Sequence, residues 1–385
     1  MTDPFMLRSR DADPHAATRG AALPGRDDAP RLAAPRFVVV IRSGPVFGLA
    51  DQLEYQAELL SRLAPGLMLT HGPHVLRADV GRVRVECLPA PDDLPRRLDK
   101  VSVAVRTARA AIAAIRRSGL PGVVIAYDPF RSGAIARAVK AVTGAHFLCE
   151  VNGAYANADN FADLGPEAER KRRAMVRFGN AVLAGADGVR LLYPSQLQGL
   201  HRARPHVPVR VYHDPVPLER FHDDGEQKYL LFVGHPFRRK GVDLLLRAFA
   251  RIRDRFPDWR LVLIGHELDA PVRGLDLSLE RVEVHRAMTN AELAPWIGRC
   301  GALVLPSRSE AMGRVLLEAG AAGKPRVGAD VDGIPCVIED GVDGYLFPKG
   351  DIVALADALA RLMASRDLRR RLGTAARTRV LSQFS

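Results

Sequence analysis

Two short apolar runs most strongly constrain the fold of this chain. Residues 37–41 read Phe-Val-Val-Val-Ile and residues 229–233 read Tyr-Leu-Leu-Phe-Val. Neither run alternates apolar with polar residues. A strand with one solvated face alternates apolar and polar residues, whereas a strand covered on both faces is apolar throughout. Each run therefore predicts a strand buried inside a parallel sheet.

Alternating strands and helices follow each run. After the first we expect strands at 82–87, 123–126, 145–150, 188–193 and 207–212, and helices at 49–63, within 100–117, and at 133–142 and 167–184. After the second we expect strands at 260–264, 282–284, 302–305 and 326–328, and helices at 242–256, 290–297, 314–322 and 352–364. This rhythm is typical of doubly wound layers, so the predicted class is α/β with two Rossmann-like domains.

The length of 385 residues fits two domains of ordinary size. Residues 1–35 contain five prolines and no apolar periodicity, which predicts a disordered arm. We expect an N-terminal domain over 36–215 and a C-terminal domain over 216–385. A cleft between two such domains is the expected ligand site.

The four cysteines exclude two classes of small module. Cys87, Cys149, Cys300 and Cys336 lie far apart without a C-x-x-C pair, so neither a zinc module nor a disulfide framework is indicated. No apolar run approaches the roughly 20 residues of a transmembrane helix, and the first residues lack a signal-peptide core. We therefore expect a cytoplasmic protein.

The net charge of +12 comes almost entirely from arginine, because lysine accounts for only seven of the 56 basic residues. Such a balance is typical of proteins that bind nucleic acid, anionic lipid or an acidic substrate, and GC-rich genome bias produces it too. The basic segments at 96–117 and 169–177 lack the interleaved aromatic residues of single-strand binders, which disfavours nucleic acid. The bases at 170–173, followed by Phe178, predict a peripheral contact with an anionic membrane surface; a solvated helix face is the alternative.

Several common phosphate and metal motifs are missing or weak. No G-x-G-x-x-G follows the first strand, and Gly323-Lys324 is followed by Pro325, so a Walker loop is excluded. Asp330 and Asp332 have the D-x-D spacing of some metal sites, although such residues beside a glycine are more often solvated. We expect no metal and no cofactor.

The most informative stretch is 304–325, which predicts a strand, a short loop and the start of a helix. The backbone amides of Met312, Gly313, Arg314 and Val315 would then point outward at the positive end of the helix dipole. That arrangement suits a diphosphate, and glycine lets the backbone approach it closely.

Two acids and one lysine complete this pattern. Glu310 precedes the helix and Glu318 lies eight positions later, about 12 Å at helical rise, which is comparable with the distance between the sugars of a nucleotide-sugar. A capping box or a solvated helical glutamate is the alternative. Lys240 lies in the glycine-bounded basic loop 234–241 after a buried strand, where α/β sheets bind ligands.

The blocks FVGHPFRRKGVDLLLRAF, LVLIG, LVLPSRSEAMGRVLLEAGAAGKP and DGIPCVIEDGVDGYLFPKGD follow one another between Phe232 and Asp351. In this order the chain resembles the retaining glycosyltransferases of family 4, glycosyltransferase group 1, with the GT-B fold. The N-terminal half is similar to the family only through its strand-loop-helix opening and residues 186–189.

The resemblance implies that 36–215 is the acceptor-side domain and 216–385 the nucleotide-sugar-binding domain, and it implies roles for individual residues. Glu310 would hold donor-sugar hydroxyls and Glu318 the ribose, while Lys240 and the amides of 313–315 would bind the diphosphate. Gly48, in the loop after the first strand, would contact substrate.

The chain also departs from the family at three positions. His235 stands where an arginine is common, so either His235 or a neighbour, Arg238 or Arg239, makes that contact. Asn152 stands where we would place a histidine near the reacting carbon; it cannot act as a base but can orient a hydroxyl. Cys336 stands where a glutamate is common.

The function predicted from this resemblance is the transfer of a hexose from a UDP- or GDP-sugar to a glycan or lipid-linked acceptor, with retention of configuration. The expected setting is cell-surface polysaccharide or glycolipid synthesis. The alternatives are a GT-B phosphorylase, a nucleotide-sugar epimerase and a non-catalytic basic binding protein. The donor and acceptor stay open. In many such enzymes a last helix packs back on the N-terminal domain, and this chain stops where that helix is expected to begin.

Overall fold

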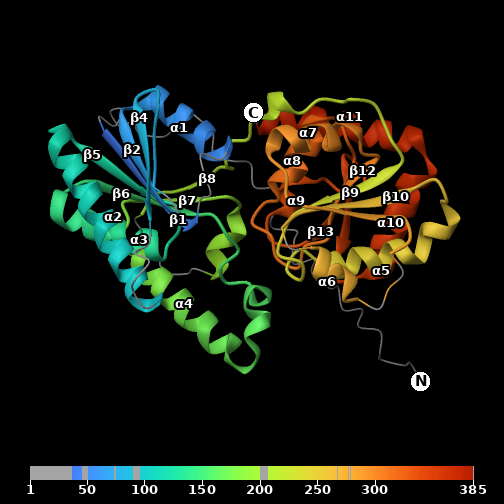
Figure 1. The fold of residues 1–385 in the computed structure, drawn as a ribbon, viewed down its shortest axis with the longest axis horizontal. Coiled ribbons are helices and arrows are strands. Elements are labelled where there is room, and N and C mark those ends of the chain that lie inside the picture. Colours follow the sequence, from blue (N-terminus) through green and yellow to red (C-terminus); the bar gives the residue numbers. More distant parts are fainter. Residues whose placement is uncertain are drawn as a thin grey trace, which may run out of the picture. The chain divides into compact units, whose positions relative to one another are not determined.

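Two β-sheets, each layered between helices, organise the chain (Figure 1). The computed structural model describes residues 37–45, 51–72, 75–89, 96–199, 207–266, 268–275, 277 and 279–384. The predicted disordered arm at 1–35 and the predicted substrate contact Gly48 lie outside the described residues. The described residues belong to one compact unit, residues 34–385.

The first sheet has the strand order β3-β4-β2-β1-β5-β6-β7-β8. Its strands are β1 (Phe37–Pro45), β2 (Gly66–Gly72), β3 (Leu76–Val80), β4 (Val83–Pro89), β5 (Gly122–Ala126), β6 (His146–Val151), β7 (Gly188–Leu191) and β8 (Val209–Val211). Its helices are α1 (Asp51–Leu63), α2 (Arg96–Ser118), α3 (Arg131–Thr143) and α4 (Ala168–Leu183), with 3-10 segments η1 (Ala158–Glu167) and η2 (Pro194–Gly199). Only β3 runs antiparallel to its neighbour among these strands. Sequence reasoning missed β2 and β3, because the first opens on glycine and the second is short, with apolar and polar residues alternating over only five positions.

Strand β1 is covered on both faces, as its continuous apolar pattern predicts. Val39 and Ile41 lie in a core with residues of α2 and α3, whereas Val38 and Val40 lie in a second core with residues of α1. Because its side chains alternate between these cores, no position of the run could be polar without burying an unpaired group.

The second sheet is entirely parallel among its described strands, in the order β11-β10-β9-β12-β13-β14. Its strands are β9 (Tyr229–Val233), β10 (Arg260–Ile264), β11 (Val282–His285), β12 (Ala302–Leu305), β13 (Arg326–Asp330) and β14 (Gly344–Pro348). Its helices are α5 (Val242–Ile252), α6 (Asp269–Arg273), α7 (Asn290–Arg299), α8 (Arg314–Ala321), α9 (Ile334–Val337), α10 (Ile352–Ala364) and α11 (Arg366–Gln383), with η3 (Leu218–Arg220) and η4 (Arg253–Arg255). The predicted helix at 242–256 changes to a 3-10 turn after Ile252. The predicted boundaries of the domains at 35 and 215 stay a prediction.

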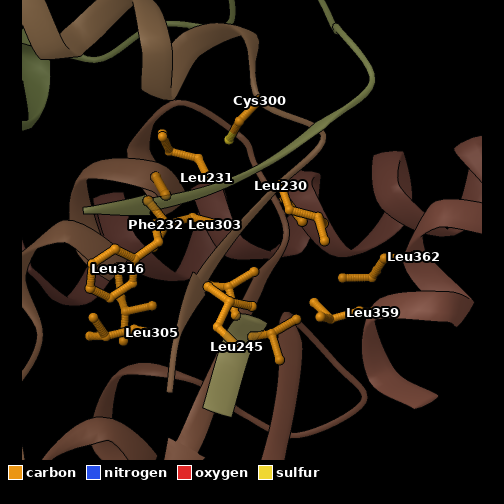
Figure 2. Close-up of a cluster of buried hydrophobic side chains, with 14 of the residues drawn as sticks. Leu230, Leu231, Phe232, Leu245, Cys300, Leu303, Leu305, Leu316, Leu359 and Leu362 are labelled. Carbon is orange, nitrogen blue, oxygen red and sulfur yellow. The ribbon is translucent and has the colours of Figure 1, made fainter. Parts of the chain in front are cut away.

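The core of the second sheet is built around β9 and β12. Leu230, Leu231, Phe232 and Leu303 are fully buried there together with Leu316 of α8 (Figure 2). The two strands are parallel neighbours, with Leu231 paired to Leu303. Their carboxyl ends therefore lie at the same edge, and the loops that follow them meet.

The C-terminal helix α11 was absent from the predicted elements. It packs against α8 and α10, and the chain beyond it contacts the segment between the two sheets. The ring of Phe384 lies 4.8 Å from that of His213, whose Nε2 lies 3.2 Å from the carbonyl oxygen of Gln383. Among the described helices, none combines the length and the apolarity needed to cross a bilayer.

Candidate active site

Hydrogen bonds and an ion pair connect the loop between β9 and α5 with the loop between β12 and α8. The backbone N–H of Arg308 donates to the carbonyl of Arg239 over 2.8 Å, and the Arg239 guanidinium donates to the Ser309 carbonyl over 3.2 Å. Arg308 also forms a two-pronged ion pair with Asp243 of α5, with distances of 2.8 and 2.7 Å. These contacts hold the two predicted phosphate-side segments in one arrangement.

Lys240 and Glu310 form an ion pair at the centre of these loops. Their side chains are only 13% and 10% exposed, and Ser307 Oγ donates to the same carboxylate over 3.3 Å. Burial alone raises the pKa of Glu310, but the Lys240 ammonium outweighs it and holds this pKa below its usual range. The carboxylate thus stays ionised and accepts hydrogen bonds only. Its stabilisation of the fold is present above the unfolded pKa of about 4.3 and is lost as the pH falls through the lowered folded value.

Gly241 is required where the two loops touch. Its φ of 69° lies in the left-handed region, and a Cβ at this position would meet the carbonyl oxygen of Pro306 at 2.0 Å. No flexible side chain can yield there, because the obstacle is backbone. Glycine at this position therefore lets Lys240 reach Glu310.

We expect Gly241→Ala to lower the free energy of unfolding by about 2–4 kcal/mol, because it combines backbone strain with a backbone clash. Urea denaturation measures this loss. Gly350→Ala is the matched control: Gly350 has φ 81° and open space around its Cβ position. That variant should lose only about 1–2 kcal/mol. Equal losses in the two variants would argue against a clash with Pro306.

The start of α8 presents free backbone donors. Among the described residues, no acceptor bonds the amides of Met312, Gly313, Arg314 and Val315. Gly313, at φ 75°, is the N-cap and supplies no side-chain cap. This end of the helix dipole favours an anion, as the sequence predicted for a diphosphate.

Glu318 lies one turn inside α8 and is 5% exposed. Its nearest charged group is the Arg314 guanidinium, at 3.6 Å. Burial raises the pKa of Glu318, and the charge of Arg314 only partly opposes this. A buried carboxylate with so little compensation is costly to the fold, which is typical of a residue kept for binding.

His235 lies near the start of the β9–α5 loop and Arg239 near its end. The His235 ring packs edge-on against the ring of His266 after β10, with centroids 5.2 Å apart. Arg239 reaches toward the β12–α8 loop, and its charge also lowers the pKa of Glu310. Arg239, like Lys240, thus acts on the Glu310 carboxylate, while its predicted phosphate contact stays a prediction.

Asn152 lies in a separate network at the carboxyl edge of the first sheet. Its amide nitrogen donates to the carbonyl of Tyr127 over 3.0 Å, and its oxygen accepts from Arg190 over 2.7 Å. Arg190 pairs in turn with Asp214 over 2.8 Å. Sequence reasoning missed Arg190, because a lone arginine inside a strand carries no motif. The catalytic role of Asn152 stays a prediction.

Asp332, the second acid of the D-x-D pair, differs from the solvated loop residue that the sequence favoured. Asp332 is mostly buried and accepts hydrogen bonds from Ser309, from the backbone of Glu310 and from Asn157. It is therefore not a solvated loop residue. Across the described part of the chain, no cluster of three or more His, Cys, Asp or Glu is arranged to hold a metal ion.

A surface pocket lies far from these loops, at the amino ends of the strands of the first sheet. Phe37, Gly66 and Arg82 line it, together with Arg84 and Arg117. None of the predicted site residues lines it, so the candidate site is the loop pair and not this pocket.

The fold and the site place the chain in a structural class. It superimposes on sucrose-phosphate synthase from Thermosynechococcus elongatus with a TM-score of 0.74 and 22% identity, over 91% of this chain and 95% of that one. Anabaena HepE in complex with UDP-glucose gives a TM-score of 0.68 at 14% identity, over 90% and 95% of the two chains. These likenesses confirm the predicted GT-B fold.

Sequence comparison adds the family. Residues 219–379 match the model of glycosyl transferases group 1. The chain is 31% identical over 203 residues to a D-inositol 3-phosphate glycosyltransferase of Xylanimonas cellulosilytica, which is 48% of each chain. It is 33% identical over 186 residues to an N-acetyl-alpha-D-glucosaminyl L-malate synthase of Bacillus anthracis, 46% of this chain and 47% of that one. The chain thus spans about half the length of the curated relatives it matches. The predicted resemblance to glycosyltransferase group 1 is thus confirmed over residues 219–379.

Proposed function

We propose that the protein is a retaining glycosyltransferase that moves a hexose from a UDP- or GDP-sugar to a glycan or lipid-linked acceptor. The observation that carries this proposal is the Lys240–Glu310 pair, buried beside the free amides at the start of α8. The free amides, which suit an anion, and the ionised Glu310 carboxylate, which can accept hydrogen bonds from hydroxyl groups, thus lie in adjoining loops.

The chemistry follows from these groups. The reaction breaks the bond between the anomeric carbon and the phosphate oxygen, and charge builds on the departing diphosphate as the sugar becomes oxocarbenium-like. The α8 amides and the Lys240 ammonium are placed to stabilise that charge, which requires no reorganisation during the reaction. Glu310, which stays ionised, would fix the donor sugar through its hydroxyls. We include no metal ion or cofactor in this proposal.

The donor and acceptor are supported to different degrees. HepE was solved with UDP-glucose, which supports a nucleotide-sugar donor here. The names of the relatives refer to inositol phosphate and malate, so they share no single acceptor. We assign acceptor binding to the first domain, where Asn152 would orient the attacking hydroxyl.

The proposal extends to a peripheral contact of α4 with an anionic membrane surface. Phe178 of this helix is 49% exposed, and Arg177 beside it is also exposed. However, all four bases at 170–173 pair with Glu167 or Glu169, which reduces the charge available to a membrane.

Binding of the donor nucleotide tests the proposal directly. A ligand at 100 times its Kd stabilises the folded state by about 2.7 kcal/mol, and we therefore expect UDP or GDP to raise the melting temperature by about 5 °C. A panel of UDP- and GDP-sugars should then identify the donor, and product analysis should show retained anomeric configuration. Absence of any shift and of any turnover across the panel would refute the proposal.

Glu318→Gln separates nucleotide binding from stability. Since burial raises the pKa of Glu318, its ionised form costs free energy at pH 7, and glutamine should raise the melting temperature of the ligand-free protein. This advantage should shrink as the pH falls, because the wild-type carboxyl then takes up its proton. The nucleotide-induced shift should meanwhile fall to a small fraction of the wild-type shift. Thermal melts at pH 5 and 7, with and without UDP and GDP, measure both effects, and an unchanged shift would remove Glu318 from the site.

A further inference from the structure

Asp332 occupies an unusual backbone position just after β13. Its φ is 48°, in the left-handed region that residues with a Cβ seldom adopt. Such a conformation persists only where surrounding contacts fix it. The contacts of the Asp332 carboxylate therefore indicate the role of this residue.

One oxygen of Asp332 carries most of these contacts. Oδ2 accepts from the Glu310 backbone N–H at 2.9 Å, from Ser309 Oγ at 3.0 Å and from Asn157 Nδ2 at 3.0 Å. Oδ1 lies 3.1 Å from the same Asn157 nitrogen. The carboxylate thus holds the backbone of the residue whose side chain pairs with Lys240.

Asn157 reaches Asp332 from the first domain. It follows β6 and is the N-cap of η1, where its Oδ1 accepts from the Asp159 backbone N–H over 3.0 Å. Because that contact uses the oxygen, the amide nitrogen must face Asp332. Asn157 is therefore a donor to Asp332 by its own local structure.

We propose that Asp332 is a positioning residue that couples the Asn157 loop of the acceptor-side domain to the orientation of Glu310. The proposal rests on the proposed function for the role of Glu310, but the coupling itself is a property of the fold. The Asn157–Asp332 contact thus helps to hold Glu310, the acid proposed to bind the donor sugar. The second acid of the D-x-D pair thereby acquires a role in hydrogen bonding.

Exchanging the two side chains tests the coupling. Asn157→Asp alone opposes two carboxylates, and Asp332→Asn alone turns an amide donor toward the Asn157 donor. We expect each single variant to lower kcat about tenfold, which corresponds to about 1.4 kcal/mol, with little change in the Kd of UDP or GDP. In the double variant, the amide introduced at position 332 would donate to the carboxylate introduced at position 157, while its oxygen still accepts from the Glu310 backbone. We therefore expect kcat to return to within about threefold of wild type.

Hydrogen exchange supplies a readout that needs no activity. The amides of residues 307–312 should exchange about tenfold faster in each single variant and recover in the double variant. If the protein transfers no sugar, the proposed function fails while this measurement still tests the coupling. Additive losses in the double variant, or single variants that behave like wild type, would overturn the proposal.

A second pair between the same segments provides the control. Lys349 pairs with Asp159 but contacts neither Ser309 nor Glu310 among the described residues. Lys349→Ala should leave kcat and the exchange of residues 307–312 within about twofold of wild type, because exposed pairs contribute little. A tenfold loss of kcat in Lys349→Ala would show that loss of another contact between the segments has the same effect. That result would overturn the specific role of Asp332.

Discussion

Glutamine in place of Glu310 is expected to lower the transfer rate by a factor of about 10² to 10³, the usual loss when one preorganised polar contact of a reaction site is removed. Glutamine keeps the shape of the side chain and can still accept from Lys240 and Ser307. It removes the negative charge that would hold the donor hydroxyls. Steady-state kinetics with the donor identified by the melting screen measures the loss.

Nucleotide binding distinguishes this effect from a general defect. Glu310→Gln leaves Glu318 and the α8 amides unchanged, so the melting shift produced by UDP or GDP should remain. Glu219→Gln, an exposed change in the same domain, should retain full activity. A Glu310→Gln enzyme within about threefold of wild-type turnover would remove Glu310 from the reaction.

Methionine in place of Lys240 should have two separable effects. The variant leaves the Glu310 carboxylate buried without its cation, which typically costs about 3–5 kcal/mol of stability. It also removes the charge that would stabilise the departing diphosphate, and we expect kcat to fall by about 10² or more. Urea denaturation and kinetics measure the two effects separately.

The stability loss caused by Lys240→Met should depend on pH. Without Lys240, burial dominates and the pKa of Glu310 should rise above its usual range. The stability loss should therefore be largest at pH 7 and shrink as the pH falls and the carboxyl takes up a proton.

The double variant Lys240→Met with Glu310→Gln separates the two effects. It removes both charges, so it should regain most of the stability and none of the activity. Lys228→Met, which breaks an exposed pair with Asp258, should change neither property. A Lys240→Met protein as stable as wild type would contradict the buried pair.

Much of the fold could be predicted because its signals are local. The apolar runs that became β1 and β9 identified both sheets, since strands covered on two faces tolerate no polar residue. The strand-loop-helix around Glu310 and Gly313 was equally readable, because glycine and the following helical pattern lie within a few residues. Strands β2 and β3 lacked such signals: β2 opens on glycine and is buried between β1 and β4, whereas β3 is a short edge strand with no buried residue.

The same distinction between local signals and long-range contacts applies to the candidate site. Sequence reasoning singled out Lys240, Glu310 and Glu318, whose roles stay predictions. It favoured solvated loop residues for Asp330 and Asp332, with a metal site as the alternative. The contact that corrects this joins Asp332 to Asn157, 175 positions away. No local pattern encodes such a partner.

The sequence by itself determined which segments become buried strands and which helix presents its amides, because both depend on residues a few positions apart. The tertiary structure alone decided that Lys240 meets Glu310 and that Asp332 holds the Glu310 backbone. The physical reason is that side-chain pairing depends on which strands are neighbours. The order β9-β12-β13 brings three distant loops to one edge, where buried charges and hydrogen-bond donors must find each other.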